Sequence, residues 1–433
     1  MDRFSILKKQ LSFGIIFKIL AMGLGYISIP LFLKFLGKQD YGLWMTIFSI
    51  VSWIYTFDLG IGNGLRNKLS ESLTKKDYIS AKEYISTGYI ILGLIAFFIL
   101  FAGLISIKFV NITKFLNINF YNEDYIKLVL MSIFSITIIN FIVLLYRVFY
   151  LSIHNSFIGE LNNFLFQIIF ISSLYLLNYF NKINLISIAI IYPGINLLIG
   201  TIFTIKFFKN YPNLKPNFKY FKKEKIKEIN SLGIVFFIIQ ISMLIILTTD
   251  NMLITKYIGT TEVATYNIVS KLFQILLVLE GLIAAPMWSL FIDAYIKKDK
   301  TWINKAFKNL NLLFLLLIMG VVIMVYILPN IVKIWIGEEL VYPKYLILYW
   351  GLFILNRVYG DIYMMFINAT GKIKFQMYLY VIGAILNIPL TIYFIKNLNM
   401  GSSGAILATN ICMLPLAVAM PIQAYYILKK IKN

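Results

Sequence analysis

The stretch LSFGIIFKILAMGLGYISIPLFLKFL, residues 11–36, decides the fold class of this chain. It follows the basic pair Lys8-Lys9 and carries only two charges of its own, Lys18 and Lys34. The stretch exceeds the roughly 7–15 apolar residues of a cleavable signal peptide and lacks an Ala-x-Ala-like cleavage site. A membrane-spanning helix needs about 20 apolar residues. The sequence therefore predicts a first transmembrane helix here.

The composition extends this conclusion to the whole chain. Of the 433 residues, 60% are hydrophobic and 14% are charged, with a mean hydropathy of +0.81, whereas soluble domains carry about 25% charged residues. These values exclude a soluble enzyme and leave room for roughly a dozen spans of about 20 residues. Apolar runs predict eleven further spans, at residues 41–62, 84–107, 125–151, 161–180, 185–206, 232–255, 264–291, 309–329, 345–368, 376–395 and 403–427.

The basic residues predict the orientation of the chain. The 40 Lys and Arg exceed the 19 Asp and Glu, giving a net charge of +21. In a soluble chain this excess would suggest nucleic-acid binding. In a membrane protein it first indicates the topology. If the N-terminus is cytoplasmic, the inner segments hold 26 basic residues and the outer segments 10. The positive-inside rule then places both termini in the cytoplasm. One cysteine and one histidine exclude a disulfide framework and a Cys/His metal site.

Residues 206–230 form the longest predicted cytoplasmic connection. This segment contains Pro212, Pro216 and eight lysines, which is typical of a solvated linker. It predicts two domains, residues 1–225 and 226–433, each with six helices.

The two predicted domains repeat one another at a register of 222 residues. The register matches Lys34 with Lys256, Gly37 with Gly259, Asp40 with Glu262, Asp58 with Glu280, and Lys75-Lys76-Asp77 with Lys297-Lys298-Asp299. Because six spans return the chain to its starting side, the repeats are parallel. The sequence thus predicts an all-α polytopic membrane protein, with twelve transmembrane helices in two parallel-repeat bundles around a central cavity. This architecture is typical of alternating-access transporters.

Several stretches resemble a known family. LGKQDYGLW (residues 36–44) and DLGIGNGLR (58–66) are similar to the first helical hairpin of Wzx-type polysaccharide flippases, members of the multidrug/oligosaccharidyl-lipid/polysaccharide exporter superfamily. DNMLI (250–254), GTTEVATY (259–266) and NATGK (368–372) agree with it in the second half. The resemblance implies twelve helices, a cationic lumen, and movement of undecaprenyl-diphosphate-linked sugar repeat units from the cytoplasmic to the periplasmic leaflet.

Charges inside spans are the candidates for function, because each costs about 2.5–3.5 kcal/mol at the centre of a membrane helix. Arg357 lies near the middle of the tenth span, and Asp361 shares its helix face one turn later. One hypothesis is a self-neutralising pair that locks the bundle. The other is that Arg357 offers its planar guanidinium to a diphosphate while Asp361 orients it.

Five further basic residues are candidates for substrate binding, each with a simpler alternative. For Lys18 and Lys271 the alternative is snorkelling toward the membrane surface. For Lys34 and Lys256 it is interfacial anchoring. For Arg147 an interfacial position competes with a role in a cytoplasmic gate. The resemblance implies that the first and seventh helices and their neighbours line the lumen, which makes Lys18 and Lys271 cavity candidates.

Asp361 and three further carboxylates are candidates for ion coupling or gating. Asp58 and Glu280 occupy equivalent positions in the two repeats, and Asp250 lies near the outer end of the seventh span. Buried carboxylates hold protons more tightly than exposed ones, so such groups could exchange protons as a cavity changes sides. Helix capping or ion pairing with neighbouring basic residues is the alternative.

The hypothesis that accounts for most of these features is a flippase for lipid-linked oligosaccharides, used in O-antigen or capsular polysaccharide synthesis in the bacterial inner membrane. Gly371-Lys372 lacks the remaining residues of a phosphate-binding loop, so neither enzymatic activity nor a cofactor is expected. The expected partners are the lipid-linked substrate, membrane lipid, and glycan polymerase and chain-length regulator proteins; nucleic acid is not expected. A cation-coupled multidrug exporter of the same fold and a non-transport subunit of a glycan-assembly complex are the alternatives.

Overall fold

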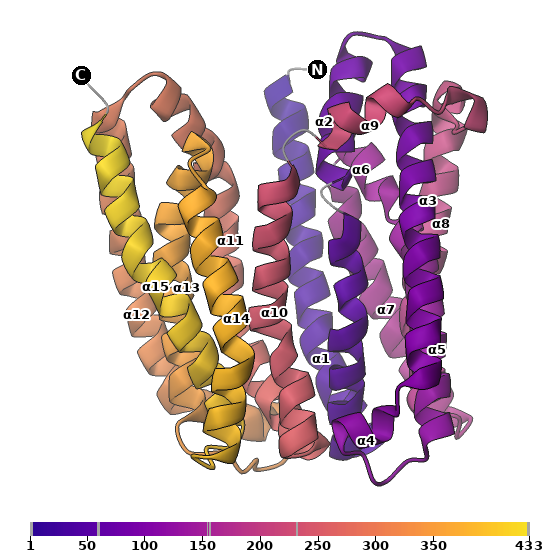
Figure 1. The fold of residues 1–433 in the computed structure, drawn as a ribbon, viewed down its shortest axis with the longest axis vertical. Helices are drawn as coiled ribbons and strands as arrows, with labels where there is room; N and C mark the ends of the chain where they lie inside the picture. The colour runs from indigo at the N-terminus through magenta and orange to yellow at the C-terminus, as the bar shows by residue number, and fades with distance from the viewer. Residues whose placement is uncertain (1–2, 59–60, 154, 156, 231–232, 431–433) are drawn as a thin grey trace. The chain divides into compact units, whose positions relative to one another are not determined.

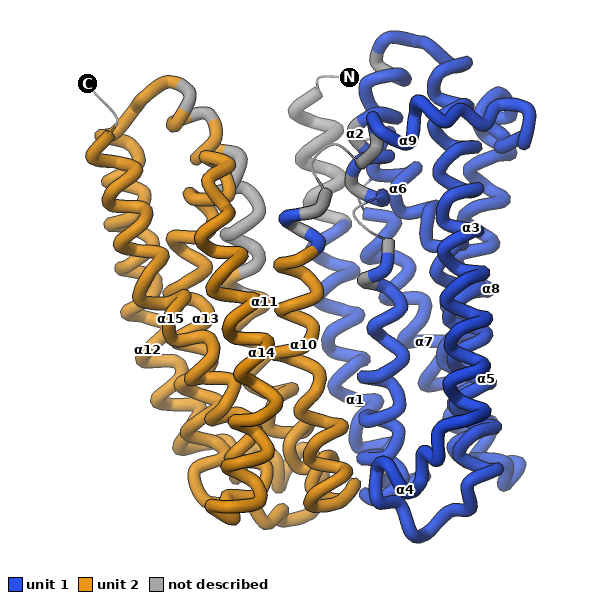
Figure 2. The backbone as a smooth tube through the Cα atoms, viewed as in Figure 1, with its two compact units in different colours: residues 1–237 blue, residues 238–433 orange. Residues whose placement is uncertain are grey.

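The computed structural model describes residues 3–58, 61–153, 155, 157–230 and 233–430. These residues form helices joined by short turns, with no strand among them (Figure 1). The chain divides into two compact units, Met1–Phe237 and Ile238–Asn433, coloured separately in Figure 2. The all-α class predicted from the sequence is confirmed for the described part of the chain.

Unit 1 contains the helices up to α9 and the first turn of α10. Its long helices pack with α1 against α7, α3 against α5, and α5 against α8. The elements are α1 (Arg3–Ser52), η1 (Trp53–Asp58), α2 (Ile61–Thr74), α3 (Tyr78–Phe109), α4 (Ile112–Leu116), α5 (Glu123–Val143), α6 (Leu145–Ser152), α7 (Phe157–Tyr179), α8 (Leu185–Asn210), η2 (Pro212–Leu214), η3 (Phe218–Tyr220) and α9 (Lys223–Asn230).

Helix α1 contains the first predicted span and the first part of the second, which continues into η1. The predicted turn between them is reduced to a kink at Gly37, whose backbone is not helical (φ 80°, ψ 162°). A side chain is strained at this positive φ, which explains a glycine at the position. Rings of both segments pack together near the kink, with Phe32 contacting Tyr41 and Trp44.

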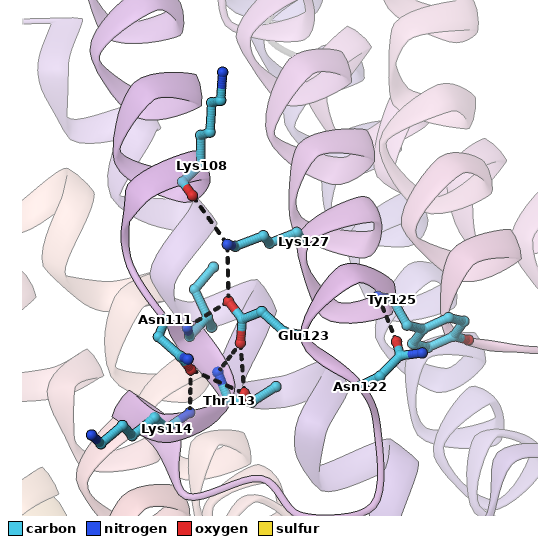
Figure 3. A network of polar contacts seen from close by, with 9 residues as sticks. Lys108, Asn111, Thr113, Lys114, Asn122, Glu123, Tyr125 and Lys127 are labelled. Carbon is cyan, nitrogen blue, oxygen red and sulfur yellow. Dashed lines mark hydrogen bonds and ion pairs between the residues drawn. The ribbon is translucent and has the colours of Figure 1, made fainter.

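A carboxylate at the start of α5 fixes the connection from α3 through α4 (Figure 3). Glu123 accepts hydrogen bonds from the backbone N–H groups of Ile112 (2.9 Å) and Thr113 (2.8 Å). Its other neighbour is Lys127, 3.4 Å away, which also donates to the carbonyl of Lys108 (3.0 Å). The carboxylate therefore satisfies the N–H groups at the start of α4 that the helix itself leaves unpaired.

Unit 2 consists of long helices with few turns. Helix α15 packs along both α13 and α14, and α13 also packs against α11 and α12. The elements are α10 (Gly233–Tyr257), α11 (Thr260–Ile296), α12 (Lys300–Ile336), α13 (Leu346–Thr370), α14 (Lys374–Lys396) and α15 (Ser402–Lys429).

The described residues include nine helices that are long and apolar enough to span a membrane. One of the nine, Gly14–Tyr55, covers the two spans that meet at Gly37. Helices α11 and α13 coincide with the eighth and tenth predicted spans but are not among the nine. Most predicted spans thus coincide with one helix. The span at 41–62 includes parts of α1, η1 and α2, and the span at 125–151 is divided between α5 and α6. The count of twelve crossings stays a prediction.

The linker is more ordered than its composition predicts. The backbone N–H of Asn217 donates to Ser86 Oγ (3.1 Å), and that of Lys222 donates to Thr87 Oγ1 (3.1 Å). Both acceptors are buried side chains of α3. The predicted linker is therefore folded onto unit 1, and the boundary between the compact units falls at residue 237.

Helix α9 is held on α3 by a charged contact. Tyr84 donates to a carboxylate oxygen of Glu228, and Lys225 Nζ donates to Tyr84 Oη (3.2 Å) and lies 3.5 Å from Glu228 Oε1. Lys68 of α2 approaches the same carboxylate at 4.0 Å. The hydrogen bond from Tyr84, followed by the nearby lysines, lowers the pKa of Glu228 below its ordinary value.

The two units share local backbone features at the predicted register of 222. Lys76 and Lys298 both adopt the left-handed conformation, with φ of 58° and 57°. Asp77 and Asp299 follow them as the N-caps of α3 and α12, and each accepts a 2.9 Å hydrogen bond from the backbone N–H three residues later. Equal turns and equal caps at equivalent positions support the internal repeat.

Candidate substrate and ion sites

Unit 2 contains a cluster of three charged side chains. Arg357 Nε donates to Asp361 Oδ2 over 2.6 Å, one turn apart on α13. Glu280 of α11 interacts electrostatically with both groups. The shared helix face predicted for Arg357 and Asp361 is confirmed, and Glu280, assigned from sequence to ion coupling, belongs to the same cluster.

The geometry of this cluster leaves part of the guanidinium unused. Among the described residues, the hydrogen bond to Asp361 is formed by Nε of Arg357, and its Nη groups form none. The side chains of the pair are about one-fifth exposed, 20% and 18%. An arginine in this state can donate to a bidentate anion such as a phosphate without releasing its carboxylate partner.

Glu280 also lies at the edge of an apolar groove of about 320 Å³ between α11, α12 and α13. Glu280 is the charged residue among the described residues that line this groove. The others are Leu276, Leu310, Leu313, Phe314, Leu316, Leu317, Gly320, Val358, Ile362 and Met365. A carboxylate beside so much hydrocarbon is a costly arrangement, which marks Glu280 as a functional candidate.

Unit 1 contains a second cavity, of about 410 Å³, with a more polar lining. Arg147 of α6 lines it and donates from Nη2 to Asn163 Oδ1 (3.1 Å). Asn140 of α5 donates to Tyr55 Oη (3.2 Å), while its own Oδ1 is buried without a partner among the described residues. The rest of the lining is Phe48, Gly62, Leu92, Phe141, Leu144, Leu145, Val148, Tyr192 and Asn196.

The break between α5 and α6 shapes this cavity. The helix is interrupted at Leu144, and α6 begins again at Leu145. Tyr192 closes the cavity from α8 and is surrounded by the rings of Trp44, Phe48 and Phe166. Aromatic faces, amides and one guanidinium in a single pocket are groups that suit the apolar faces and hydroxyls of sugars and a phosphate.

Asp250 forms a separate buried network in unit 2. Its side chain is 2% exposed, and Oδ2 accepts hydrogen bonds from Tyr266 Oη (2.6 Å) and Thr409 Oγ1 (3.3 Å). Thr409 also accepts from Asn387 Nδ2 (3.2 Å). Oδ1 of Asp250 has no partner among the described residues. A buried carboxylate with uncharged hydroxyl donors is suited to holding either a proton or a small cation.

The remaining predicted site residues lie on α1, η1, α10 and α11. Lys18 is half-buried on α1, and Lys34 is exposed on the same helix. Lys256 lies at the end of α10 with its Nζ 5.5 Å from the ring of Tyr257, and Lys271 is half-buried on α11. Asp58 ends η1, but its side chain lies outside the described residues.

Uncharged polar residues were not predicted as site residues. Asn140, Asn196, Asn387 and Thr409 all lie inside apolar runs, where polar side chains are expensive and therefore informative. That signal was present in the sequence. The positions of Tyr55 and Tyr192 in the cavity lining and the burial of Tyr266 were not, because 29 tyrosines are spread along the chain and most are indistinguishable from packing residues.

Two protein families match the sequence. The polysaccharide biosynthesis protein family matches residues 7–291, and the MatE family matches residues 236–393. A Salmonella typhimurium protein assigned as an O-antigen transporter is 23% identical over 402 residues, covering 90% of this chain and 89% of that protein. A Yersinia pseudotuberculosis protein assigned as an O-antigen export protein is 24% identical over 379 residues, covering 82% of each.

Solved structures similar to this chain are transporters. The inward-facing conformation of a multidrug resistance MATE family transporter of the MOP superfamily has a TM-score of 0.76, with 13% identity and 98% of each chain covered. The outward-facing conformation of a MATE family transporter has a TM-score of 0.68, with 14% identity, covering 99% of this chain and 97% of that one. Likeness at such identity concerns the fold, and it confirms the predicted multi-pass architecture of two repeated helical bundles.

Proposed function

Because this chain belongs to the polysaccharide biosynthesis protein family, we propose that it is a flippase that moves lipid-linked oligosaccharide repeat units across the bacterial cytoplasmic membrane. The observation that carries the proposal is the family match over residues 7–291, together with relatives over most of the chain that are assigned to O-antigen transport and export. The product would serve the synthesis of O-antigen or a related surface polysaccharide.

The charged cluster of unit 2 supports an anionic headgroup as cargo. In this proposal the Nη groups of Arg357 bind the diphosphate while Asp361 holds Nε and fixes the plane of the guanidinium. The ion pair reduces the cost of keeping an arginine in a membrane helix. The polyprenyl chain remains in lipid, so the protein has to shelter only the sugars and the phosphates.

The cavity of unit 1 supports a sugar as the other part of the cargo. Asn140 Oδ1 is an acceptor without a partner among the described residues, and it would accept a sugar hydroxyl. Arg147 donates to Asn163, and Tyr55 accepts from Asn140, so both side chains are held in place before a ligand arrives. Preorganised groups of this kind bind with a smaller loss of side-chain entropy.

A multidrug exporter of the same fold is less well supported. The MatE family matches residues 236–393, a smaller part of the chain, and the MATE structures resemble it at 13–14% identity, which concerns the fold alone. As a transporter rather than an enzyme, the chain would act with a glycan polymerase and a chain-length regulator in the inner membrane, with both termini cytoplasmic.

Purified protein in liposomes tests the proposal. A fluorescent undecaprenyl-diphosphate oligosaccharide is placed in both leaflets, and an impermeant reductant reports the accessible fraction over time. We expect the slow second phase to become at least about tenfold faster with protein than without it, and phosphatidylcholine carrying the same fluorophore to stay slow. If the protein instead drives efflux of a cationic dye and leaves the oligosaccharide lipid in place, the exporter is the correct function.

A further inference from the structure

Unit 2 has a further cavity besides the groove beside Glu280. It is distinct from the charged cluster and from the Asp250 network. It has a volume of about 470 Å³ and lies where the turn between α13 and α14 meets the last turns of α15. Its lining residues are Lys372, Phe375, Ala419, Ile422, Gln423, Tyr426, Ile427 and Lys430. The volume is in the range of small-molecule sites.

One side of this groove is cationic. Lys372 in the turn and Lys430 at the end of α15 both line it, and both side chains are exposed. From residue 362 to residue 433 the sequence contains no Asp or Glu. Lys333 pairs with Glu339 at 2.5 Å. Lys372 and Lys430 lie in the stretch 362–433, which offers no carboxylate side chain for such a pair.

The polar wall is fixed by a glutamine. Gln423 Nε2 donates to the backbone carbonyl of Lys372 over 2.8 Å, which ties the turn to α15. The Oε1 atom of the same side chain is buried and has no partner among the described residues. A buried amide oxygen without a donor is costly, so it indicates a ligand that brings a hydroxyl or ammonium group.

The other side of the groove is apolar and faces away from the helical core. Phe375, Ile422 and Tyr426 are 47%, 52% and 61% exposed, although they belong to the membrane-spanning helices α14 and α15. These two helices lie side by side along their length (Figure 1). Exposed rings and aliphatic chains on such helices contact lipid, with lysines at the helix ends at the depth of the headgroups.

We propose that this groove is a binding site for an anionic phospholipid, with its phosphate on Lys372 and Lys430 and its acyl chains along Phe375, Ile422 and Tyr426. A headgroup hydroxyl, as in phosphatidylglycerol, donates to Gln423 Oε1. Basic pockets between transmembrane helices bind anionic lipid headgroups in this way. The apolar wall favours a lipid over a free phosphate, which would leave those side chains without a partner. The proposal stands whatever cargo the protein carries.

Lipid adducts counted by native mass spectrometry test the site. Full-length protein in a nonionic detergent is titrated with phosphatidylglycerol or with phosphatidylcholine of the same chains. We expect tighter binding of phosphatidylglycerol, and the double variant Lys372→Gln/Lys430→Gln to weaken it about 30-fold, or about fivefold for each lysine. The matched control, Lys305→Gln/Lys308→Gln, removes two exposed charges of α12 outside the groove and keeps wild-type binding.

An arginine variant and a competition with inorganic phosphate complete the test. Lys372→Arg/Lys430→Arg keeps the charge and retains binding within about twofold, which also shows that altered folding does not explain the loss in the glutamine variant. Equal binding of the two lipids, or an equal loss in the control variant, overturns the proposal. Displacement of the lipid by millimolar inorganic phosphate alone would show a free phosphate site and would also overturn it.

Discussion

Arg357 and Asp361 form a 2.6 Å ion pair one turn apart on α13, and Glu280 of α11 interacts electrostatically with both. One cation thus stands against two carboxylates in the same part of unit 2. Removing the arginine would leave both acids without their counter-ion. A variant at this position therefore tests binding and folding at once, and the two effects have to be separated.

Replacement of Arg357 is expected to reduce the transport carried out by each folded molecule. Arg357→Lys retains part of the export, because a point charge replaces a planar fork. Arg357→Ala loses more than about tenfold, since a charged hydrogen bond is worth about 1.5–3 kcal/mol. Polysaccharide at the cell surface, normalised to the amount of folded protein, measures the effect.

A second substitution distinguishes binding from structural support. In Arg357→Ala/Asp361→Asn one uncompensated charge is removed, so the amount of folded protein recovers. We expect export to stay low in this variant if Arg357 binds the headgroup. Recovered export in the double variant, or full export in Arg357→Ala, would reduce Arg357 to a structural partner of Asp361.

Ion coupling is predicted to involve Asp58 and Glu280, which are equivalent in the sequence repeat. Asp58→Asn/Glu280→Gln should still bind the lipid-linked substrate, because these acids do not favour an anionic headgroup. Flipping in proteoliposomes should become insensitive to an imposed pH or sodium gradient. A gradient response that persists in the double variant would favour uncoupled flipping, with the two acids acting as caps or ion-pair partners.

The role of Asp250 can be tested with its hydrogen-bond partner Tyr266 as the matched control. Asp250→Asn keeps an oxygen that accepts from Tyr266 and Thr409 but removes the ionisable group, so we expect folded protein without a gradient response. Tyr266→Phe removes the 2.6 Å hydrogen bond but keeps the acid; it should cost about 1 kcal/mol of stability and leave the response intact. The opposite pattern would assign Asp250 a purely structural role.

The orientation prediction rests on the asymmetry of basic residues. Cysteines are introduced at Lys223 and Lys333, both exposed, in a Cys412→Ser background that removes the buried native thiol. An impermeant reagent added outside intact cells should label position 333 and spare position 223. Labelling of position 223 alone would invert the topology.

The attachment of α9 is expected to depend on pH through Glu228. The folded protein lowers the pKa of this carboxyl, so its stabilising contribution is present above the pKa of the unfolded chain and is lost as the pH falls through the folded pKa. Hydrogen exchange of residues 217–228, corrected for intrinsic rates, should accelerate between about pH 6 and about pH 3. Glu228→Gln should show faster exchange at neutral pH and a weaker pH response, whereas Glu224→Gln, an exposed neighbour, should resemble the wild type.

Much of the fold could be predicted because apolar runs in a membrane protein are long and interrupted by charge. Most predicted spans coincide with a helix, and the repeat is visible in caps and turns such as Asp77 and Asp299. The kink at Gly37 could not be distinguished from a full turn, since a charged residue follows it. The attachment of the linker to unit 1 could not be predicted, because the decisive acceptors, Ser86 and Thr87, belong to another helix.

The candidate sites were predicted only where they are charged. Arg357 and Asp361 were identified as a pair by their spacing on one helix, and this pair is present. The proximity of Glu280 could not be predicted, because it depends on how α11 packs against α13. The cavity of unit 1 depends on a helix break at Leu144 that follows no glycine or proline.

The fixed linker has a practical consequence for probing the protein. Residues 206–230 look like a natural place for a reporter domain, an affinity tag or a protease site, since they join the two halves and are rich in lysine. Yet an insertion there would separate Asn217 and Lys222 from their acceptors on α3. Reporter fusions in this segment would then measure a partly unfolded first half. The turn at Lys298, between α11 and α12, offers an exposed alternative.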